Sequence, residues 1–375
     1  MKKYGLFSIA FRLTAVLVAT GAWFGPRAHA QAPTDYFPTS GWRTSSPQEQ
    51  QLNKKILKRL FKRIRNNQIS GIDSLLIVRN GYVVKEEYFH GWGPDDLHTL
   101  QSDSKSVTSL LLGIALGQGK LSSIDEPVLG FFPEYRKIGN VEERKSAMTL
   151  RDLLTMRTGL DWSEDPYEGS PLFQLNNCQC DWLKFTLDWP MRETPGTRFE
   201  YNSGGVILLA GVIRNASGIN TDTFAQRYLF DPLGITQVRW YYGQPDNLPH
   251  TGGGLNLRPL DMAKIGYLML RGGRWENQQV VPVDWVSEST SHAVSSPRTF
   301  AGYPVDYGYL WWLLSLSGKA GPHQQDDDIY TASGAQGQWI FVIPKYDMVV
   351  VSTGNTPNFD QAVGFLYSDI LPAVD

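Results

Sequence analysis

The stretch Ser102-Asp103-Ser104-Lys105 opens an apolar segment whose pattern predicts a helix over residues 102–117. Residues three positions apart share one helix face, so the ammonium of Lys105 can reach the hydroxyl of Ser102. A serine hydroxyl is a poor nucleophile at neutral pH and needs a base beside it. A lysine becomes that base when burial or neighbouring charge lowers its pKa. Ser102 could instead cap the helix, and the two roles are compatible.

The N-terminus predicts an export signal over residues 1–30. Lys2 and Lys3 form its basic start, residues 13–24 form an uncharged apolar run, and Ala-His-Ala at its end is a cleavage site. An uncleaved anchor is the alternative, but Arg12 leaves the run shorter than the roughly 20 residues that a membrane span needs. We therefore expect cleavage, no membrane span afterwards, and a periplasmic or secreted protein.

Composition and charge narrow the class of protein. The chain has 375 residues, of which 42% are hydrophobic, and this is enough for a large core. The formal net charge of −2 becomes about −6 once the four basic residues of the signal are removed. A mildly acidic exported protein is not expected to bind nucleic acid.

The chain has only two cysteines, Cys178 and Cys180. An oxidising compartment would permit a bond between them, but a separation of one residue makes a relaxed disulfide hard to form. Two thiols are also too few for a closed zinc site. We interpret them as inert or structural cysteines, with a redox switch as the minor alternative.

Strand patterns stand near both ends of the chain. Residues 74–79 and 82–89 flank an Asn-Gly pair, which is a strong hairpin signal, and a second hairpin is expected at 338–343 and 348–353. Mostly helical patterns lie between them. The arrangement predicts an α+β fold with one antiparallel sheet flanked by helices.

The predicted domain organisation follows from this order of elements. Residues 31–46 are rich in Pro, Ser and Thr and predict a flexible leader. We expect residues 47–120 and 244–375 to form an α/β lobe, and residues 121–243 to form a mainly helical second lobe. A cleft would lie between the two lobes, where pockets commonly occur.

Tyr201-Asn202-Ser203 is the second candidate motif, just before an apolar helical run. A phenol held near a cationic lysine loses its proton more easily, and can then act as general base and general acid. Ser203 could pass hydrogen bonds between Tyr201, Lys105 and substrate. Taken alone, the triplet is more typical of a core tyrosine.

Ala332-Ser333-Gly334-Ala335 is the third candidate motif and leads into the last hairpin. Small residues let the backbone approach a ligand closely. A backbone N–H here and that of Ser102 could together stabilise a developing oxyanion. Taken alone, the segment is more typical of a glycine-rich turn.

In this order, the three motifs resemble the serine β-lactamase and penicillin-binding protein family. The match is closest to the branch with class C β-lactamases, DD-peptidases, related esterases and 6-aminohexanoate-dimer hydrolases. Accessory patterns extend the resemblance over most of the mature chain, at residues 153–160, 230–235, 252–255 and 307–312.

This resemblance implies a β-lactamase/transpeptidase-like fold and a set of roles. Ser102 would be acylated, and Lys105 with Tyr201 would share the acid–base work. The backbone N–H groups of Ser102 and Ala335 would form the oxyanion hole. No metal or organic cofactor is implied.

The third motif departs from the family pattern. Penicillin-recognising members carry Lys-Thr-Gly where this chain has Ala332-Ser333-Gly334. The missing cation removes a charge-assisted contact to a substrate carboxylate worth roughly 1.5–3 kcal/mol. We therefore expect hydrolysis of an ester or linear amide. The alternatives are a DD-peptidase or β-lactamase, and a peptide- or wall-binding module without turnover.

Several residues are candidates for contact with a small ester, amide or peptide substrate. Ser203, Ser333 and Gly334 belong to the motifs themselves. Tyr167 lies in a loop that could cover the cleft, and His250 precedes three glycines. A surface position is the alternative for each of these last two.

Overall fold

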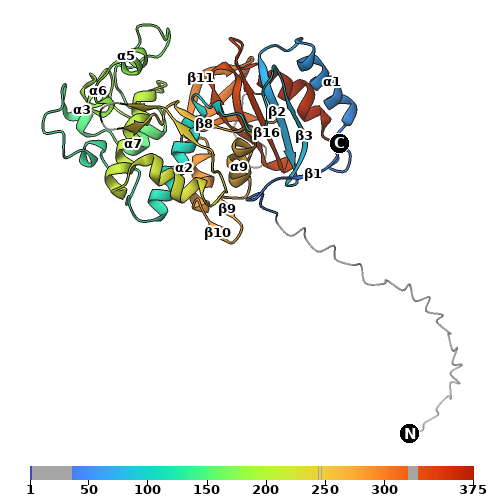
Figure 1. Cartoon of the computed structure of the whole chain (residues 1–375). Coiled ribbons are helices and arrows are strands. Elements are labelled where there is room, and N and C mark those ends of the chain that lie inside the picture. The colour runs from blue at the N-terminus through green and yellow to red at the C-terminus, as the bar shows by residue number, and fades with distance from the viewer. Residues whose placement is uncertain (2–35, 244, 246, 320–327) are drawn as a thin grey trace, which may run out of the picture. The chain divides into compact units, whose positions relative to one another are not determined.

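One large sheet organises the computed structural model, with strands in the order β1-β3-β2-β16-β15-β14-β13-β12-β11 (Figure 1). Neighbouring strands are antiparallel except for the parallel pair of β1 and β3. The structure describes residues 1, 36–243, 245, 247–319 and 328–375, so the predicted signal lies outside the described residues except for Met1. The strands of the sheet are β1 (Arg43–Thr44), β2 (Ile72–Arg79), β3 (Tyr82–Tyr88), β11 (Val294–Phe300), β12 (Tyr303–Tyr307), β13 (Trp312–Ser315), β14 (Asp328–Gly334), β15 (Gln338–Ile343) and β16 (Met348–Gly354).

The two predicted hairpins form, and they pair with each other. Asn80 and Gly81 have φ values of 51° and 76°, the left-handed backbone that a tight two-residue hairpin turn requires. β2 then pairs with β16, for example at Ile77 opposite Val350. The ends of the domain thus meet in the middle of one sheet, and the predicted α+β fold with a mainly antiparallel sheet is confirmed.

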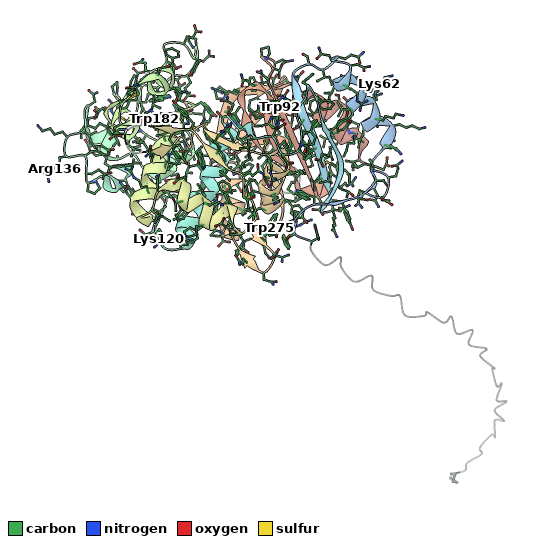
Figure 2. The ribbon with its side chains drawn as sticks, viewed as in Figure 1. Lys62, Trp92, Lys120, Arg136, Trp182 and Trp275 are labelled. Atoms are coloured by element: carbon green, nitrogen blue, oxygen red, sulfur yellow. A yellow bond between two sulfur atoms is a disulfide. The ribbon has the colours of Figure 1, made fainter. Side chains whose placement is uncertain are left out.

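Helices cover both faces of the sheet. α1 packs against the C-terminal helical segments, where Arg63 forms an ion pair with the buried Asp369 at 3.0 Å. Lys62 of α1 points away from the core (Figure 2). α9 packs on β15, β16 and β2 on the other face. These helices are α1 (Lys54–Arg65), α9 (Pro259–Leu270), α10 (Val283–Ser289), α11 (Gln361–Phe365), η5 (Leu366–Ile370) and η6 (Leu371–Ala373).

The middle of the chain forms the expected group of helices around α7. α2 contacts α7 on one side and β14 on the other, so it connects this group to the sheet (Figure 1). The predicted capping box of α4 is present, with Thr149 and Asp152 bonded reciprocally. These helices are α2 (Asp103–Gly117), η1 (Val128–Phe131), α3 (Glu143–Ser146), α4 (Leu150–Leu154), α5 (Pro171–Asn177), α6 (Trp182–Asp188), α7 (Ser203–Ser217), α8 (Thr221–Ala225) and η2 (Gln226–Phe230).

Short strands and turns complete the described structure. They form small two- and three-stranded sheets. The short elements are β4 (His98–Thr99), β5 (Arg239–Trp240), β6 (Tyr242–Gly243), β7 (Leu248–Pro249), β8 (Leu255–Leu257), β9 (Arg274–Trp275), β10 (Gln278–Gln279), η3 (Ala335–Gly337) and η4 (Pro344–Tyr346). Within the described residues, no helix is both long and apolar enough to cross a membrane.

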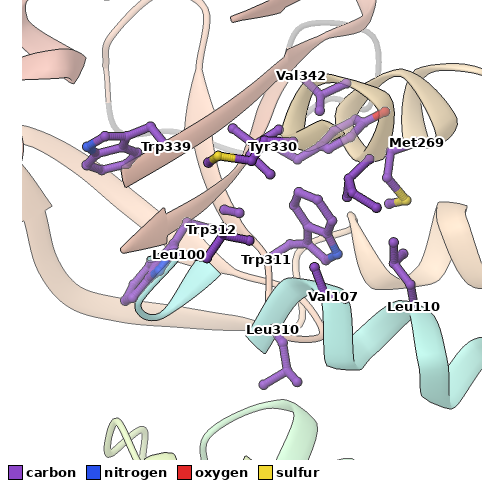
Figure 3. Close-up of a cluster of buried hydrophobic side chains, with 14 of the residues drawn as sticks. Leu100, Val107, Leu110, Met269, Leu310, Trp311, Trp312, Tyr330, Trp339 and Val342 are labelled. Carbon is purple, nitrogen blue, oxygen red and sulfur yellow. The ribbon is translucent and has the colours of Figure 1, made fainter. Parts of the chain in front are cut away.

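The core fixes the helix that begins after Ser102. Val107 and Leu110 of α2 point toward Trp311 and Met269, and all four side chains are at most 1% exposed (Figure 3). Burying apolar side chains of this size stabilises a fold by about 1.5–3 kcal/mol each. The N-terminus of α2 is therefore held by packing along the length of the helix.

The described part of the predicted leader does not fit the prediction of flexibility. Trp42 donates its indole N–H to the carbonyl of Leu260 at 3.2 Å, and its ring packs against Tyr267. Arg43 and Thr44 pair with β3. Burial of aromatic rings here outweighs the chain entropy that the polar composition favours.

The two cysteines are joined to each other, which fits a structural role although their close spacing disfavoured a bond. Cys178 and Cys180 form a disulfide, with their Cα atoms 5.2 Å apart. This separation lies within the usual range for disulfides, because the backbone turns away from the end of α5 at Cys178. The bond closes the loop between α5 and α6.

Candidate active site

Ser102 and Lys105 meet as the spacing predicts. Lys105 donates from Nζ to Ser102 Oγ at 3.0 Å and to the carbonyl of Gly252 at 2.5 Å. The lysine side chain is buried, with 1% exposure. Ser102 stands at the N-cap position but makes no side-chain capping bond. Its hydroxyl is therefore directed to the lysine rather than to the helix end.

Tyr201 lies over the same lysine. Lys105 Nζ is 4.8 Å from the centroid of the Tyr201 ring, and Trp312 stacks on that ring at 5.9 Å. Asn202 caps α7 by accepting the N–H of Gly205 at 2.8 Å, which fixes the residue just before it. A phenol, an ammonium and a serine hydroxyl thus converge from two helix N-termini.

The third motif reaches the site because glycine permits a close approach. A Cβ on Gly334, the last residue of β14, would lie 2.2 Å from the carbonyl oxygen of Leu100. β14 therefore packs directly on the segment that leads into Ser102. The two neighbours of Gly334 in the chain, Ser333 and Ala335, both line the cavity that contains Ser102.

One cavity of about 890 Å³ collects most of the predicted site. The predicted residues that line it are Ser102, Tyr167, Tyr201, Ser203, His250, Ser333 and Ala335. The two other predicted residues do not line the cavity. Lys105 is buried beneath Ser102, and Gly334 is the last residue of β14. The cavity can hold a small ester or amide against a nucleophile with a base beside it.

Comparison with known proteins assigns the chain to a family. A family model described as Beta-lactamase matches residues 57–370. The chain belongs to the β-lactamase family. It is 23% identical over 303 residues to the 6-aminohexanoate-dimer hydrolase of Paenarthrobacter ureafaciens, covering 77% of this chain and 74% of that protein.

Solved structures agree on the fold of this β-lactamase-family chain. A Bacillus anthracis protein described as a candidate 6-aminohexanoate-dimer hydrolase superposes with a TM-score of 0.69 at 19% identity, covering 88% of this chain and 87% of that one. EstCE1, described as a hydrolase with promiscuous acyltransferase activity, gives a TM-score of 0.69 at 18% identity, covering 86% and 98%. The relatives of this chain include hydrolases, and the fold is the one that they share.

His250 is a buried residue and not the surface residue of the alternative interpretation. The residue is 5% exposed, and its Nε2 lies 3.0 Å from Asn176 Oδ1. Burial, aided by the charge of Lys105, lowers the pKa of His250 to about 4. Its carbonyl accepts the N–H groups of Gly253 and Gly254. His250 thus shapes the turn that presents the Gly252 carbonyl to the lysine. Tyr167, in contrast, is 47% exposed at the cavity wall.

Glu164 was not among the predicted site residues, yet it lines the cavity. It accepts the Ser203 hydroxyl at 3.1 Å, the Ser203 N–H at 2.5 Å and the indole N–H of Trp162 at 2.8 Å. The Ser203 hydroxyl therefore bonds to Glu164, and the expected relay to Lys105 and Tyr201 does not form. No local spacing signals this contact, because 39 residues separate the two partners.

Asp103 is a second residue whose environment the motif does not reveal. Its side chain is fully buried, and neither carboxyl oxygen has a hydrogen-bond partner among the described residues. Burial raises the pKa of Asp103 well above its usual range, although the charge of Lys105 opposes the shift. The environment favours a neutral carboxyl beside the nucleophile. Within the described ranges, no group of three metal-ligating side chains gathers anywhere.

Proposed function

We propose that this β-lactamase-family chain is an exported serine hydrolase that cleaves an ester or a linear amide through an acyl-enzyme on Ser102. The observation that carries the proposal is the 3.0 Å hydrogen bond between Ser102 Oγ and the buried Lys105, at the wall of a cavity that Tyr201 and Ala335 also line. A nucleophile, two acid–base groups and oxyanion donors are what acyl transfer requires.

The proposed reaction has two half-reactions. Neutral Lys105 or ionised Tyr201 takes the proton of Ser102 as Oγ adds to the substrate carbonyl. The backbone N–H groups of Ser102 and Ala335 stabilise the oxyanion, and the leaving atom departs with a proton from Tyr201. Water then attacks the acyl-serine through the same groups and releases the acid. Lys105 and Tyr201 act as a coupled pair, so neither is the sole base.

The preference for an ester or linear amide rests on the third motif. Ser333 is the polar residue at the end of β14, and the family's lysine is absent from this motif. The curated relative named for 6-aminohexanoate-dimer hydrolysis supports a linear amide, and EstCE1 supports a broad hydrolase chemistry.

Turnover of p-nitrophenyl acetate tests the proposal. Ser102→Ala and Lys105→Ala should each lower kcat by at least about 10³-fold. Lys120→Ala is the matched control, at an exposed lysine just beyond α2 (Figure 2), and should leave kcat unchanged. Equal turnover by wild type and Ser102→Ala would sink the proposal.

Family membership keeps a DD-peptidase or β-lactamase as the second candidate. Saturable labelling of Ser102 by a fluorescent penicillin would favour it over the esterase. Export is also a proposal, supported by the N-terminal pattern. A mature protein that begins at Gln31 in the medium or periplasm would support it, and full-length protein confined to the cytoplasm would contradict it.

A further inference from the structure

A cation enters the cavity from an element outside the three motifs. Arg298 of β11 lines the cavity, and its guanidinium carbon lies 4.6 Å from the centroid of the Tyr201 ring. The same carbon lies 5.9 Å from the Trp312 ring. Lys105 Nζ lies 4.8 Å from the centroid of the same ring, so two basic side chains contact the phenol that would protonate the leaving atom. A positive charge therefore stands at the site even though the third motif has none.

The arginine is held in place by its strand. The pairing of β11 with β12 is irregular between Ser295 and Thr299, so Arg298 lies in a bulged stretch. Bulges redirect side chains out of the regular alternation of a strand. Two residues later, Phe300 is buried and packs against Trp312 at 5.0 Å. This anchor fixes the backbone that carries the guanidinium.

The N–H groups of the Arg298 guanidinium are available to a ligand. It forms no hydrogen bond or ion pair with any side chain or carbonyl in the described part of the chain, and the residue is exposed. Glu164 and Asp165 also line the cavity, but neither is paired with it; the carboxylate of Glu164 is occupied by Ser203 and Trp162. A planar guanidinium with free N–H groups suits a carboxylate bound through two hydrogen bonds.

We propose that Arg298 binds a carboxylate on the leaving portion of the substrate. The inference rests on the proposed function, in which Tyr201 protonates the leaving atom, because Arg298 stacks on that tyrosine. The substrate class is then an N-acyl amino acid, a short linear peptide or an ester of a hydroxy acid. Arg298 supplies from β11 the charge that the third motif lacks.

Two esters that differ in one charge test this inference. In 3-acetoxybenzoate the leaving portion carries a carboxylate, and in its methyl ester it does not. Acetyl is transferred to Ser102 Oγ, the hydroxybenzoate leaves with the proton, and water releases acetate. Arg298→Gln should lower kcat/KM for the carboxylate ester roughly 10- to 100-fold and for the methyl ester less than about threefold. Arg298→Lys should restore part of the loss.

Arg136→Gln is the matched control, since it removes the same charge at an exposed position on the helical lobe, away from the cavity (Figure 2). It should change neither rate. An equal fall for both esters in Arg298→Gln would overturn the inference and make Arg298 a positioning residue for Tyr201. No fall for either ester would also overturn it.

A binding measurement separates this inference from the proposed function. Calorimetry of 3-acetamidobenzoate with the Ser102→Ala protein needs no turnover. A Kd that rises roughly tenfold or more in Ser102→Ala/Arg298→Gln supports the carboxylate site even if the wild type hydrolyses neither ester. An unchanged Kd overturns it even if Ser102-dependent hydrolysis is found.

Discussion

At the residue scale, burial determines what each polar group near Ser102 can do. Lys105 is enclosed and held by one hydroxyl and one carbonyl, whereas Asp103 is enclosed without a partner among the described residues. A buried lysine with defined acceptors is suited to exchange a proton with its neighbour. A buried carboxyl without donors is a cost to folding.

Asp103→Asn should stabilise the protein at alkaline pH. The raised pKa of Asp103 means that the folded state holds its proton more tightly than the unfolded state. The stability that protonated Asp103 contributes is therefore lost as the pH rises above its pKa of about 3.9 in the unfolded state. Asparagine does not titrate, so the variant does not lose stability in this way. Chemical denaturation should show a gain of about 1–3 kcal/mol at pH 8 and a smaller gain at pH 5. A loss at pH 8 would show that the carboxylate is a required counter-ion of Lys105.

At the element scale, α2 is placed by contacts that leave no room for extra atoms. A Cβ on Gly113 would lie 2.2 Å from Cδ1 of Trp285, which is 5% exposed. A Cβ on Gly204, in the first turn of α7, would lie 2.5 Å from Trp162. The two helices that carry Ser102 and Tyr201 at their N-termini thus both pack closely against a tryptophan ring.

Gly113→Ala should therefore destabilise the protein by about 1–3 kcal/mol, because the tryptophan must move to admit the methyl group. Gly364→Ala is the matched control in helix α11, where no heavy atom lies within 4 Å of the added Cβ. That change should be neutral or stabilising by up to about 1 kcal/mol. Urea denaturation compares the two, and equal effects would mean that close packing does not position α2.

At the scale of the whole molecule, local patterns predicted more of the fold than long-range contacts did. Asn80-Gly81 and the alternating segments beside it specify a hairpin by short-range geometry. In contrast, β11 contains Pro297 and four exposed residues, so it has no strand-like periodicity and is formed by its neighbours.

The residues of the candidate site also fall into two groups, those that local sequence patterns predict and those that only long-range packing brings together. Ser102, Lys105 and Tyr201 were predictable because short spacings and their order along the chain are visible in the sequence. Glu164 and Arg298 were not, because only the packing of distant segments brings them to the cavity. Arg298 adds a positive charge to the cavity that the third motif alone does not predict.

The pH dependence of unfolding is a whole-molecule property with an identifiable source. The pKa of His250 is lowered to about 4 by burial, so between about 6.5 and 4 the unfolded state binds a proton that the folded state does not. Stability should therefore fall by up to about 3 kcal/mol as the pH drops through this window. His98, with its pKa also lowered to about 4 by burial, adds to the same slope.

His250→Asn should remove its share of that slope. The difference in unfolding free energy between wild type and variant, followed by denaturation from pH 7.5 to 4, should shift in favour of the variant as the pH falls. A flat difference for His250→Asn would contradict the burial argument.

The central claim is that Ser102 is the nucleophile that forms the acyl-enzyme, and mass spectrometry of the covalently labelled protein tests it most directly. The protein is treated with a fluorophosphonate probe, digested, and compared with Ser102→Ala. The account predicts one stoichiometric adduct, on the peptide that contains Ser102, and none in the variant. An adduct on another residue, or ester hydrolysis by a protein whose Ser102 stays unlabelled, would contradict it.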